Sequence, residues 1–255
     1  MAGNDSFAHA KSAREDEFYT QLSDIEKEMR HYRKHFNGKT VFCNCDDPFE
    51  SNFFKYFVLN FNRLGLKKLI ATCYTGSPIA NQQLSIFDVL GISEDTKDRP
   101  YKAVVTTVYD KTGDGGVDMF DVAELFKSGE NELTELAGDG DFRSSECLEL
   151  MDEADIVVTN PPFSLFRGYV STLLEHKKSF VIIGSLNAIT YKEIFPLLMN
   201  NRIWLGYNNG DIAFTVPDDY EPRETRYWQD ETGQKWRSMG NIAWFTNLDI
   251  KKLYQ

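Results

Sequence analysis

The sequence predicts an α/β fold in which helices cover both faces of a mainly parallel sheet. Between residues 39 and 200, short apolar runs of strand length alternate with longer runs whose apolar residues recur at helical spacing. Polar residues follow the strand-like runs at Asp47, Asp141 and Asn160, and such sheets bind ligands at the carboxyl ends of their strands. A hydrophobic content of 42% over 255 residues, with 14% aromatic residues, is sufficient for a core. That length suits one large domain, or a domain with a small lobe.

The N-terminal part of the chain supplies the first helices and strands of this pattern. In order, it predicts a flexible tail at 1–15, a helix at 22–36, a strand at 39–44, a helix at 51–65 and a strand at 67–74. Ser23 is a candidate N-cap, because a hydroxyl can accept a hydrogen bond from the unpaired N–H groups of a first helical turn. Gly65 is expected to end the second helix, since glycine adopts the left-handed conformation found there.

Residues 76–135 read as a variable, acidic insertion. Between Asp88 and Asp155 there are 19 acidic and 6 basic residues, a net charge of −13. The whole chain carries −11, so the remaining residues sum to +2. Because one segment holds the acidity, the overall charge does not exclude a nucleic-acid partner.

Within the insertion, 102–109 is strand-like, and we expect a hairpin that turns across 110–115. The same stretch, 110–121, also matches part of a calcium loop, with oxygen-bearing side chains at its first, third, fifth, ninth and twelfth positions. The twelfth residue is Asp121 where a glutamate is usual, and no helix is predicted before the loop. The hairpin is therefore favoured, and no metal is expected.

The alternation resumes after the insertion. In order, it predicts a short helix at 145–152, a strand at 155–159, a helix at 164–176, a strand at 179–185 and a helix at 190–200. Beyond 205 the pattern becomes β-rich, with strands at 211–216 and 241–245 and a hairpin at 225–236 around 231–233.

The cysteines and the N-terminus point to a cytoplasmic protein. Three of the four cysteines lie in apolar, strand-like runs, which favours reduced thiols in a core. Cys43 and Cys45 lack further ligands at the spacing of a metal site. The first residues are polar, and no apolar run approaches the length needed to cross a bilayer.

The most informative stretch is Asn160-Pro161-Pro162-Phe163, directly after the predicted strand at 155–159. An exocyclic amine such as adenine N6 is a poor nucleophile, because its lone pair is delocalised into the ring. Two acceptors placed at its N–H groups, the Asn160 side-chain oxygen and the Pro161 carbonyl, would restore that lone pair. The two prolines restrict the backbone that aims these oxygens, and Phe163 offers a face on which a purine can stack. An ordinary turn after a strand is the alternative interpretation.

The chain resembles the EcoRI-type adenine-specific DNA methyltransferases over residues 16 to 250. The matching blocks, in order, are DEFYTQ, FCNCDDP, SNFFKYF, GDGDFRSSE, DIVVTNPPFSLFR, TYKEIFPLL and NIAWFTNLD. The resemblance implies a Rossmann-like catalytic domain at 16–205 that uses S-adenosylmethionine. It also implies that a β-rich part at 206–255 completes the sheet, and that the partner is double-stranded DNA with its target adenine flipped out.

Cofactor-binding residues follow from the same resemblance. Phe18, Tyr19 and Thr20 would line the methionine end of the cofactor, and Asp47 would lie near its amino group. Asp141 and Phe142 would hold its adenine, and Asn160 would also face it. Two alternatives stay open, a turn at Asp47 that caps the next helix and a simple surface loop at Asp141.

Three departures from the family pattern are visible. Ser51 and Phe53 stand where glycines are usual. The acid that commonly follows the second strand and binds the ribose hydroxyls is absent, so the ribose contact is unassigned. Relatives also continue past the last matching block, so we expect either a fragment, or target recognition by 205–240 or by a separate subunit.

A hairpin at 223–240 is the candidate for DNA contact. Basic residues there alternate with Tyr227, Trp228 and Trp236, and they are Arg223, Arg226, Lys235 and Arg237. A half-buried hairpin with solvated charges is the alternative. The sequence therefore predicts an adenine-N6 DNA modification methylase. RNA adenine, cytosine N4 or a glutamine amide as the acceptor, and an inactive binding remnant, are the competing hypotheses.

Overall fold

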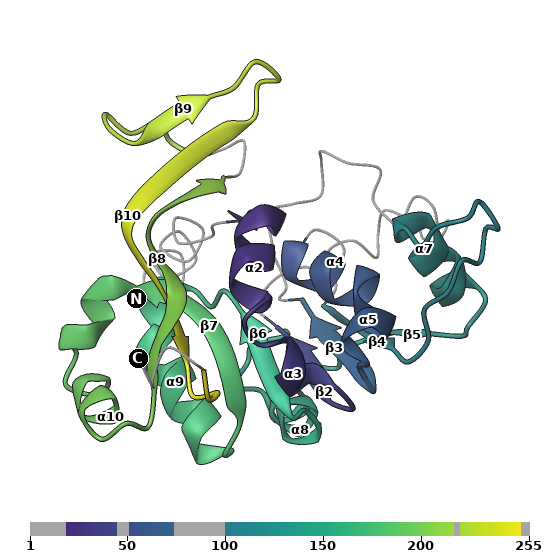
Figure 1. Cartoon of the computed structure of the whole chain (residues 1–255), viewed down its shortest axis with the longest axis horizontal. Coiled ribbons are helices and arrows are strands. Elements are labelled where there is room, and N and C mark those ends of the chain that lie inside the picture. Colours follow the sequence, from purple (N-terminus) through teal and green to yellow (C-terminus); the bar gives the residue numbers. More distant parts are fainter. Residues whose placement is uncertain (1–18, 45–50, 74–99, 217–219, 251–255) are drawn as a thin grey trace, which may run out of the picture.

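The computed structural model of the chain describes residues 20–44, 51–73, 100–216 and 220–250, and the backbone of residue 19 (Figure 1). Within these ranges a single ten-stranded sheet runs in the order β1-β8-β10-β7-β6-β2-β3-β4-β5, with β9 paired to β10. No helix in the described ranges is long and apolar enough to span a membrane.

Four parallel strands form the centre of the sheet. They are β3 (Lys68–Thr72), β2 (Thr40–Cys43), β6 (Ile156–Thr159) and β7 (Ser179–Ser185). Every residue of β2 and of β6 is buried, as expected of strands with helices on both faces. Their carboxyl ends therefore lie together at one edge of the sheet.

Antiparallel strands flank this centre on both sides. On one side β3 pairs with β4 (Tyr101–Val105), which pairs with β5 (Glu132–Glu135). On the other side β7 pairs with β10 (Lys235–Thr246), then β8 (Trp204–Thr215) and β1 (Tyr19–Thr20). The predicted α/β class is confirmed, with the parallel strands concentrated in the central four.

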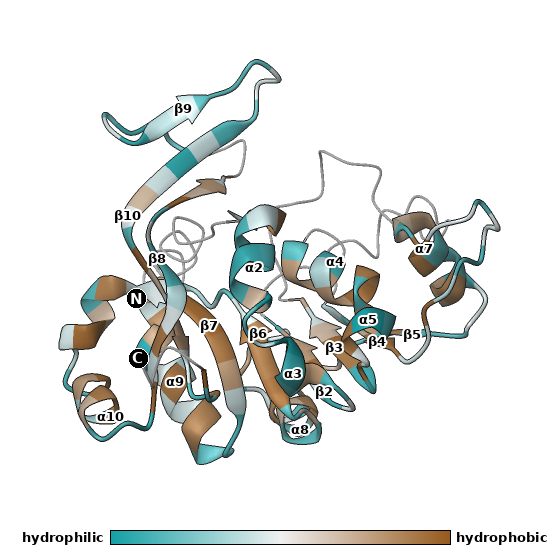
Figure 2. Cartoon of the chain, in the orientation of Figure 1, coloured by the Kyte–Doolittle hydropathy of each residue, from teal (hydrophilic) through white to brown (hydrophobic). Residues whose placement is uncertain are grey.

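The helices cover both faces. One face carries α2 (Leu22–Met29), α3 (Arg33–Phe36), α4 (Asn52–Leu59) and α5 (Phe61–Leu64), which share a core cluster with strand residues such as Trp244. The other carries α8 (Ser145–Glu153) and α9 (Phe166–Glu175), with the 3₁₀ turns η2 (Phe163–Leu165) and η3 (Leu186–Thr190) and the short α10 (Phe195–Met199) nearby. Figure 2 shows the apolar residues concentrated in the sheet and in the helix faces against it.

Several predicted boundaries are wrong in detail. The helix predicted at 22–36 is two helices, and its N-cap is Gln21 rather than Ser23. The helix predicted at 51–65 breaks at Asn60, although it ends at Gly65 in a left-handed conformation (φ 64°) as expected. Tertiary packing decides these breaks, because helix propensity changes little along either run.

The hairpin predicted across 110–115 is also wrong. After β4 the chain forms a loop and then α7 (Met119–Lys127), and β4 pairs with the later strand β5. The helix begins where it does because Asp118 and Asp121 form a capping box, each side chain accepting from the backbone N–H of the other. A reciprocal cap of this kind favours a helix over a turn between strands.

An arm projects from the sheet (Figure 1). It consists of the outer parts of β8 and β10 together with β9 (Tyr227–Gln229), which pairs antiparallel with the start of β10. The connection turns at Gly233 (φ 88°), so the predicted hairpin around 231–233 is confirmed. A register shift between Met239 and Ile242 separates the arm from the part of β10 inside the sheet.

The buried carboxylate of Glu28 joins α2 to β8. Glu28 is 0% exposed and accepts from the backbone N–H groups of Tyr207 (2.9 Å) and Asn208 (2.8 Å). It also accepts from the Asn208 side-chain amide (2.7 Å) and from the Tyr32 hydroxyl (2.7 Å). Two backbone donors of an irregular strand are thereby satisfied by a helix side chain, which holds α2 and the preceding β1 against the root of the arm.

Candidate functional site

The candidate site lies at the carboxyl edge of the central strands. Asn44 directly follows β2, Thr72 is the last residue of β3, and Asn160 directly follows β6. These strands are neighbours in the order β6-β2-β3, so the three residues lie along one edge. The structure therefore places Asn160 at the edge where the sequence predicted a ligand site, and it adds Asn44 and Thr72, which were not predicted from the sequence.

The Asn160–Phe163 turn begins with buried residues and ends with half-buried ones. Asn160 is 7% exposed, Pro161 is buried, and Pro162 and Phe163 are half-buried. Pro162 has φ −52° and ψ 130°, and its carbonyl accepts from the N–H of Leu165 (2.9 Å) in η2. In the described part of the chain no backbone N–H binds the Pro161 carbonyl oxygen. Phe163 packs against the core cluster of the α2–α4 face, so one side of its ring is supported by protein.

Asn44 ties this turn to the neighbouring strand and to α9. The Thr159 hydroxyl donates to the Asn44 carbonyl, and the Tyr169 hydroxyl donates to the Asn44 side-chain oxygen. Tyr169 in turn meets Phe142 edge to face, with ring centroids 4.9 Å apart at 68°. Two separate segments of the sequence, 141–142 and 160–163, are thus joined through Asn44 and Tyr169.

The Asp141 carboxylate is held by its neighbour Arg143. It accepts from the backbone N–H (2.8 Å), the Nε (2.8 Å) and the Nη2 (2.5 Å) of that residue. The Arg143 hydrogen bonds lower the pKa of Asp141 although partial burial opposes them, so the carboxylate is ionised and can accept further hydrogen bonds. The Arg143 guanidinium also lies over the Phe142 ring at 5.3 Å.

The N-terminal block reaches the same edge. Residues 19 and 20 form β1, paired with Thr215 and Phe214 of β8, and the Thr20 carbonyl accepts from the Asn52 side chain (2.8 Å) at the start of α4. The predicted residues Phe18 and Asp47 lie outside the described residues, and of Tyr19 only the backbone is described.

Several buried polar side-chain atoms at this edge lack hydrogen-bond partners among the described residues. Among them are the Oγ1 atoms of Thr20 and Thr72 and the Nδ2 atom of Asn44. Buried polar groups in folded proteins are nearly always hydrogen-bonded, so a cluster of exceptions indicates a place where a ligand completes the bonding. Hydroxyl and amide groups match the hydroxyls and ring nitrogens of a nucleoside. The residues present therefore fit a cofactor such as S-adenosylmethionine.

The four predicted DNA-contact residues all lie on or beside the arm. Arg226 forms an ion pair with Asp211 (3.2 Å), Lys235 donates to the Tyr220 carbonyl (3.3 Å), and the Arg223 guanidinium lies 5.9 Å from the Tyr220 ring centroid. Arg237 is half-buried, and its Nε and Nη1 atoms are buried with no hydrogen-bond partner in the described ranges. A guanidinium in that state favours an anion beside it.

Two tryptophans occupy the opposite face of the arm. Trp228 and Trp236 are cross-strand partners whose rings stack with centroids 6.0 Å apart and planes 5° apart. Trp236 donates its Nε1–H to Asp230 (2.8 Å), and Trp228 is 41% exposed. Because side chains alternate along a strand, these two tryptophans lie on the face of the arm opposite to Lys235 and Arg237.

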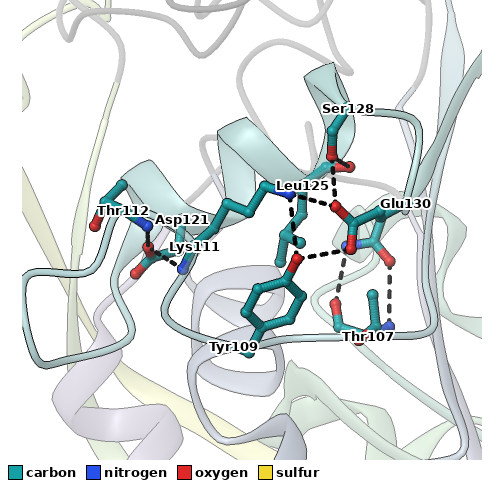
Figure 3. Close-up of polar contacts among 9 residues, drawn as sticks. Thr107, Tyr109, Lys111, Thr112, Asp121, Leu125, Ser128 and Glu130 are labelled. Carbon is teal, nitrogen blue, oxygen red and sulfur yellow. Dashed lines mark hydrogen bonds and ion pairs between the residues drawn. The ribbon is translucent and has the colours of Figure 1, made fainter.

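The acidic loop before α7 is organised by its own backbone. Asp121 accepts from the N–H groups of Lys111 and Thr112 (both 2.8 Å), while Lys111 also bridges to Glu130 (2.6 Å), as Figure 3 shows. Carboxylate oxygens of Asp110, Asp114 and Asp121 lie within 4.8 Å of one another. Each of these carboxylates also accepts a hydrogen bond from a backbone N–H of the loop.

Comparison with known proteins finds similar proteins over nearly the whole length of the chain. A family model described as adenine-specific methyltransferase EcoRI matches residues 6–255. The chain is 44% identical, over 98% of its length and 70% of the relative's, to the type II methyltransferase M.EcoRI of Escherichia coli. It is 35% identical, over 95% of its length and 64% of theirs, to M.MgeORF184P of Mycoplasma genitalium and M.MpnI of Mycoplasma pneumoniae, both named type II methyltransferases.

Proposed function

The chain belongs to the EcoRI family of adenine-specific methyltransferases, and from that premise we propose that it transfers a methyl group from S-adenosylmethionine to adenine N6 in DNA as a sequence-specific modification enzyme of the cytoplasm. The observation that supports this most directly is the Asn160-Pro161 turn at the end of β6, beside the buried unpartnered atoms of Asn44 and Thr72. This turn offers hydrogen-bond acceptors for an amine, and the neighbouring polar groups can bind a nucleoside.

Asn160 and Pro161 supply the chemistry on the protein side. Their two carbonyl oxygens accept the N–H groups of the target amine and draw its lone pair out of conjugation. Pro161 and Pro162 keep the turn stiff, since their rings fix φ. The buried position of Asn160 strengthens its hydrogen bond, because water does not compete there. No strong general base is required, because alignment with the sulfonium methyl is the main demand.

In this proposal, the cofactor is held by residues near the same edge of the sheet. Thr20 reaches it from β1, and Asp141, ionised and acceptor-only, takes the amino group of the cofactor's adenine. Phe142, at 6% exposure, contributes an edge rather than an open face. When bound, the cofactor supplies an activated methyl group. Phe18, Tyr19 and Asp47 stay in the proposal as the methionine-end residues implied by the family pattern.

The target adenine is drawn out of the duplex and stacks on Phe163. That residue is half-buried and backed by the core cluster, so it offers a supported ring rather than a mobile one. The arm contacts the DNA around the extruded base. Arg223, Arg226 and Lys235, on the surface of the arm, bind phosphate groups of the DNA. The partly buried guanidinium of Arg237 binds another phosphate.

Incubation with tritiated S-adenosylmethionine and mixed-sequence duplex DNA, followed by digestion to nucleosides, tests the proposal. We expect the radioactivity to be recovered in N6-methyl-2′-deoxyadenosine. Parallel incubations with RNA and with protein complete the test, because label in N4-methylcytosine, in RNA or in a glutamine side chain would change the assigned substrate and keep the chemistry. Cofactor binding without transfer to any acceptor would identify an inactive remnant and refute the enzyme.

Replacement of Arg237 by methionine tests the arm. We expect weaker binding to every duplex sequence, and a slope of log Kd against log salt that falls by about one, as for one lost phosphate contact. Fluorescence anisotropy of labelled DNA at several salt concentrations measures both quantities. Arg202→Met, an exposed arginine outside the arm, is the matched control. An unchanged slope in Arg237→Met would remove this residue from the DNA interface.

A further inference from the structure

The ribose contact of the cofactor is the part of the site that the sequence left unassigned. The acid that commonly follows the second strand of the family is absent from the stretch that ends β3. At that place the structure has Thr72, whose buried hydroxyl has no hydrogen-bond partner among the described residues. The neighbouring strand β2 is followed by Asn44, whose buried Nδ2 is in the same condition.

The sheet register sets these two residues side by side. Cys43 of β2 lies opposite Ala71 of β3, so Asn44 and Thr72 come one step further along two parallel neighbours. Phe42 and Ile70, two residues earlier in each strand, both belong to the core cluster on the α8–α9 face. Because side chains alternate along a strand, Asn44 and Thr72 face the same side. Adjacent parallel strands lie about 4.8 Å apart, a spacing that matches two vicinal hydroxyl groups and their hydrogen bonds.

The neighbouring residues leave the Asn44 Nδ2 atom and the Thr72 hydroxyl available for a ligand. The Tyr169 hydroxyl occupies the side-chain oxygen of Asn44, which leaves the Nδ2 donor as the end available to bind. The Cys147 thiol lies near the Thr72 hydroxyl without a hydrogen bond of ordinary geometry, and it contacts the Gly140 carbonyl instead (3.5 Å). Phe142, the proposed neighbour of the cofactor's adenine, packs in the same cluster.

We propose that Asn44 and Thr72 together bind the ribose hydroxyls of S-adenosylmethionine, as a neutral pair in place of the usual acid. Asn44 donates from Nδ2 to one ribose oxygen, and the Thr72 hydroxyl both donates and accepts at the other. This inference rests on the proposed function, because it places the same cofactor at the same edge. It extends that function by naming the residues that take over a role the family gives to a carboxylate.

Thr72→Val tests the pair with a change that keeps the side-chain shape. A buried hydroxyl without a partner gives no stability, so the melting temperature is expected to stay the same or rise. Affinity for S-adenosylhomocysteine, measured by calorimetry, is expected to fall about three- to tenfold. Thr246→Val is the matched control, because that buried hydroxyl donates to Phe180 (2.7 Å) and accepts from Leu248 (3.0 Å). It should show the opposite pattern, a lower melting temperature with unchanged affinity.

The 2′-deoxy and 3′-deoxy derivatives of S-adenosylhomocysteine give the second readout. The wild-type chain is expected to bind each derivative more weakly than the parent compound. In Thr72→Val the penalty for one missing hydroxyl should disappear, and in Asn44→Ala the penalty for the other. Because each comparison uses two ligands on one variant, any loss of stability in Asn44→Ala cancels.

Full deoxy penalties in both variants would overturn the inference and leave the proposed function intact. Failure of the wild-type chain to bind either S-adenosylmethionine or S-adenosylhomocysteine would overturn the proposed function, and this inference with it. Both results come from binding measurements, so neither depends on finding the DNA sequence that the protein modifies.

Discussion

Replacement of Asn160 by alanine is expected to reduce methyl transfer by about a hundred- to a thousandfold while cofactor affinity changes little. The reason is that the Asn160 side-chain oxygen acts on the developing charge of the target amine, and loss of one such preorganised group typically has an effect of this size. Steady-state transfer of tritium to DNA measures the first quantity, and calorimetry with S-adenosylmethionine measures the second.

Ser164→Ala is the matched control for this substitution. Ser164 lies next to the turn but is exposed, so its removal should leave transfer almost unchanged. An Asn160→Ala variant with normal turnover would refute the acceptor role. A variant that loses cofactor affinity in proportion to transfer would show that Asn160 holds the cofactor rather than the target amine.

Replacement of Glu28 by alanine is expected to lower the free energy of unfolding by about 3 kcal/mol or more, the largest stability effect predicted here. The change would leave two backbone N–H groups, an amide and a hydroxyl without their acceptor inside the protein. It would also leave a cavity between α2 and β8. Urea unfolding followed by circular dichroism measures the difference.

Glu26→Ala on the same helix is the matched control, because Glu26 is exposed and its loss should change stability by less than about 0.5 kcal/mol. Equal effects of the two substitutions would show that the Glu28 hydrogen bonds contribute no more than a surface charge. Since α2 follows β1 directly, a structural role for Glu28 also predicts weaker cofactor binding in Glu28→Ala before global unfolding.

The local features of this protein were predictable from short stretches of sequence. The strand–turn signal at 155–163 predicted where Asn160 would lie, because an apolar run followed by Asn-Pro-Pro has few other conformations. Gly65 marked a helix end, and Gly233 a hairpin, because both positions need the left-handed region. The acidic loop misled the prediction, because the capping box of Asp118 and Asp121 outweighed the strand-like residues before it.

The sequence by itself determined the α/β class, the family, and the turn that carries the proposed chemistry, because each depends on residues close together in the chain. Only the tertiary structure showed that Asn44, Thr72 and Thr20 leave buried polar atoms at one edge, that two guanidinium nitrogens of Arg237 are buried, and that Glu28 anchors β8. Those facts depend on strand order and register, which bring together residues more than 100 positions apart and are not written in any short stretch.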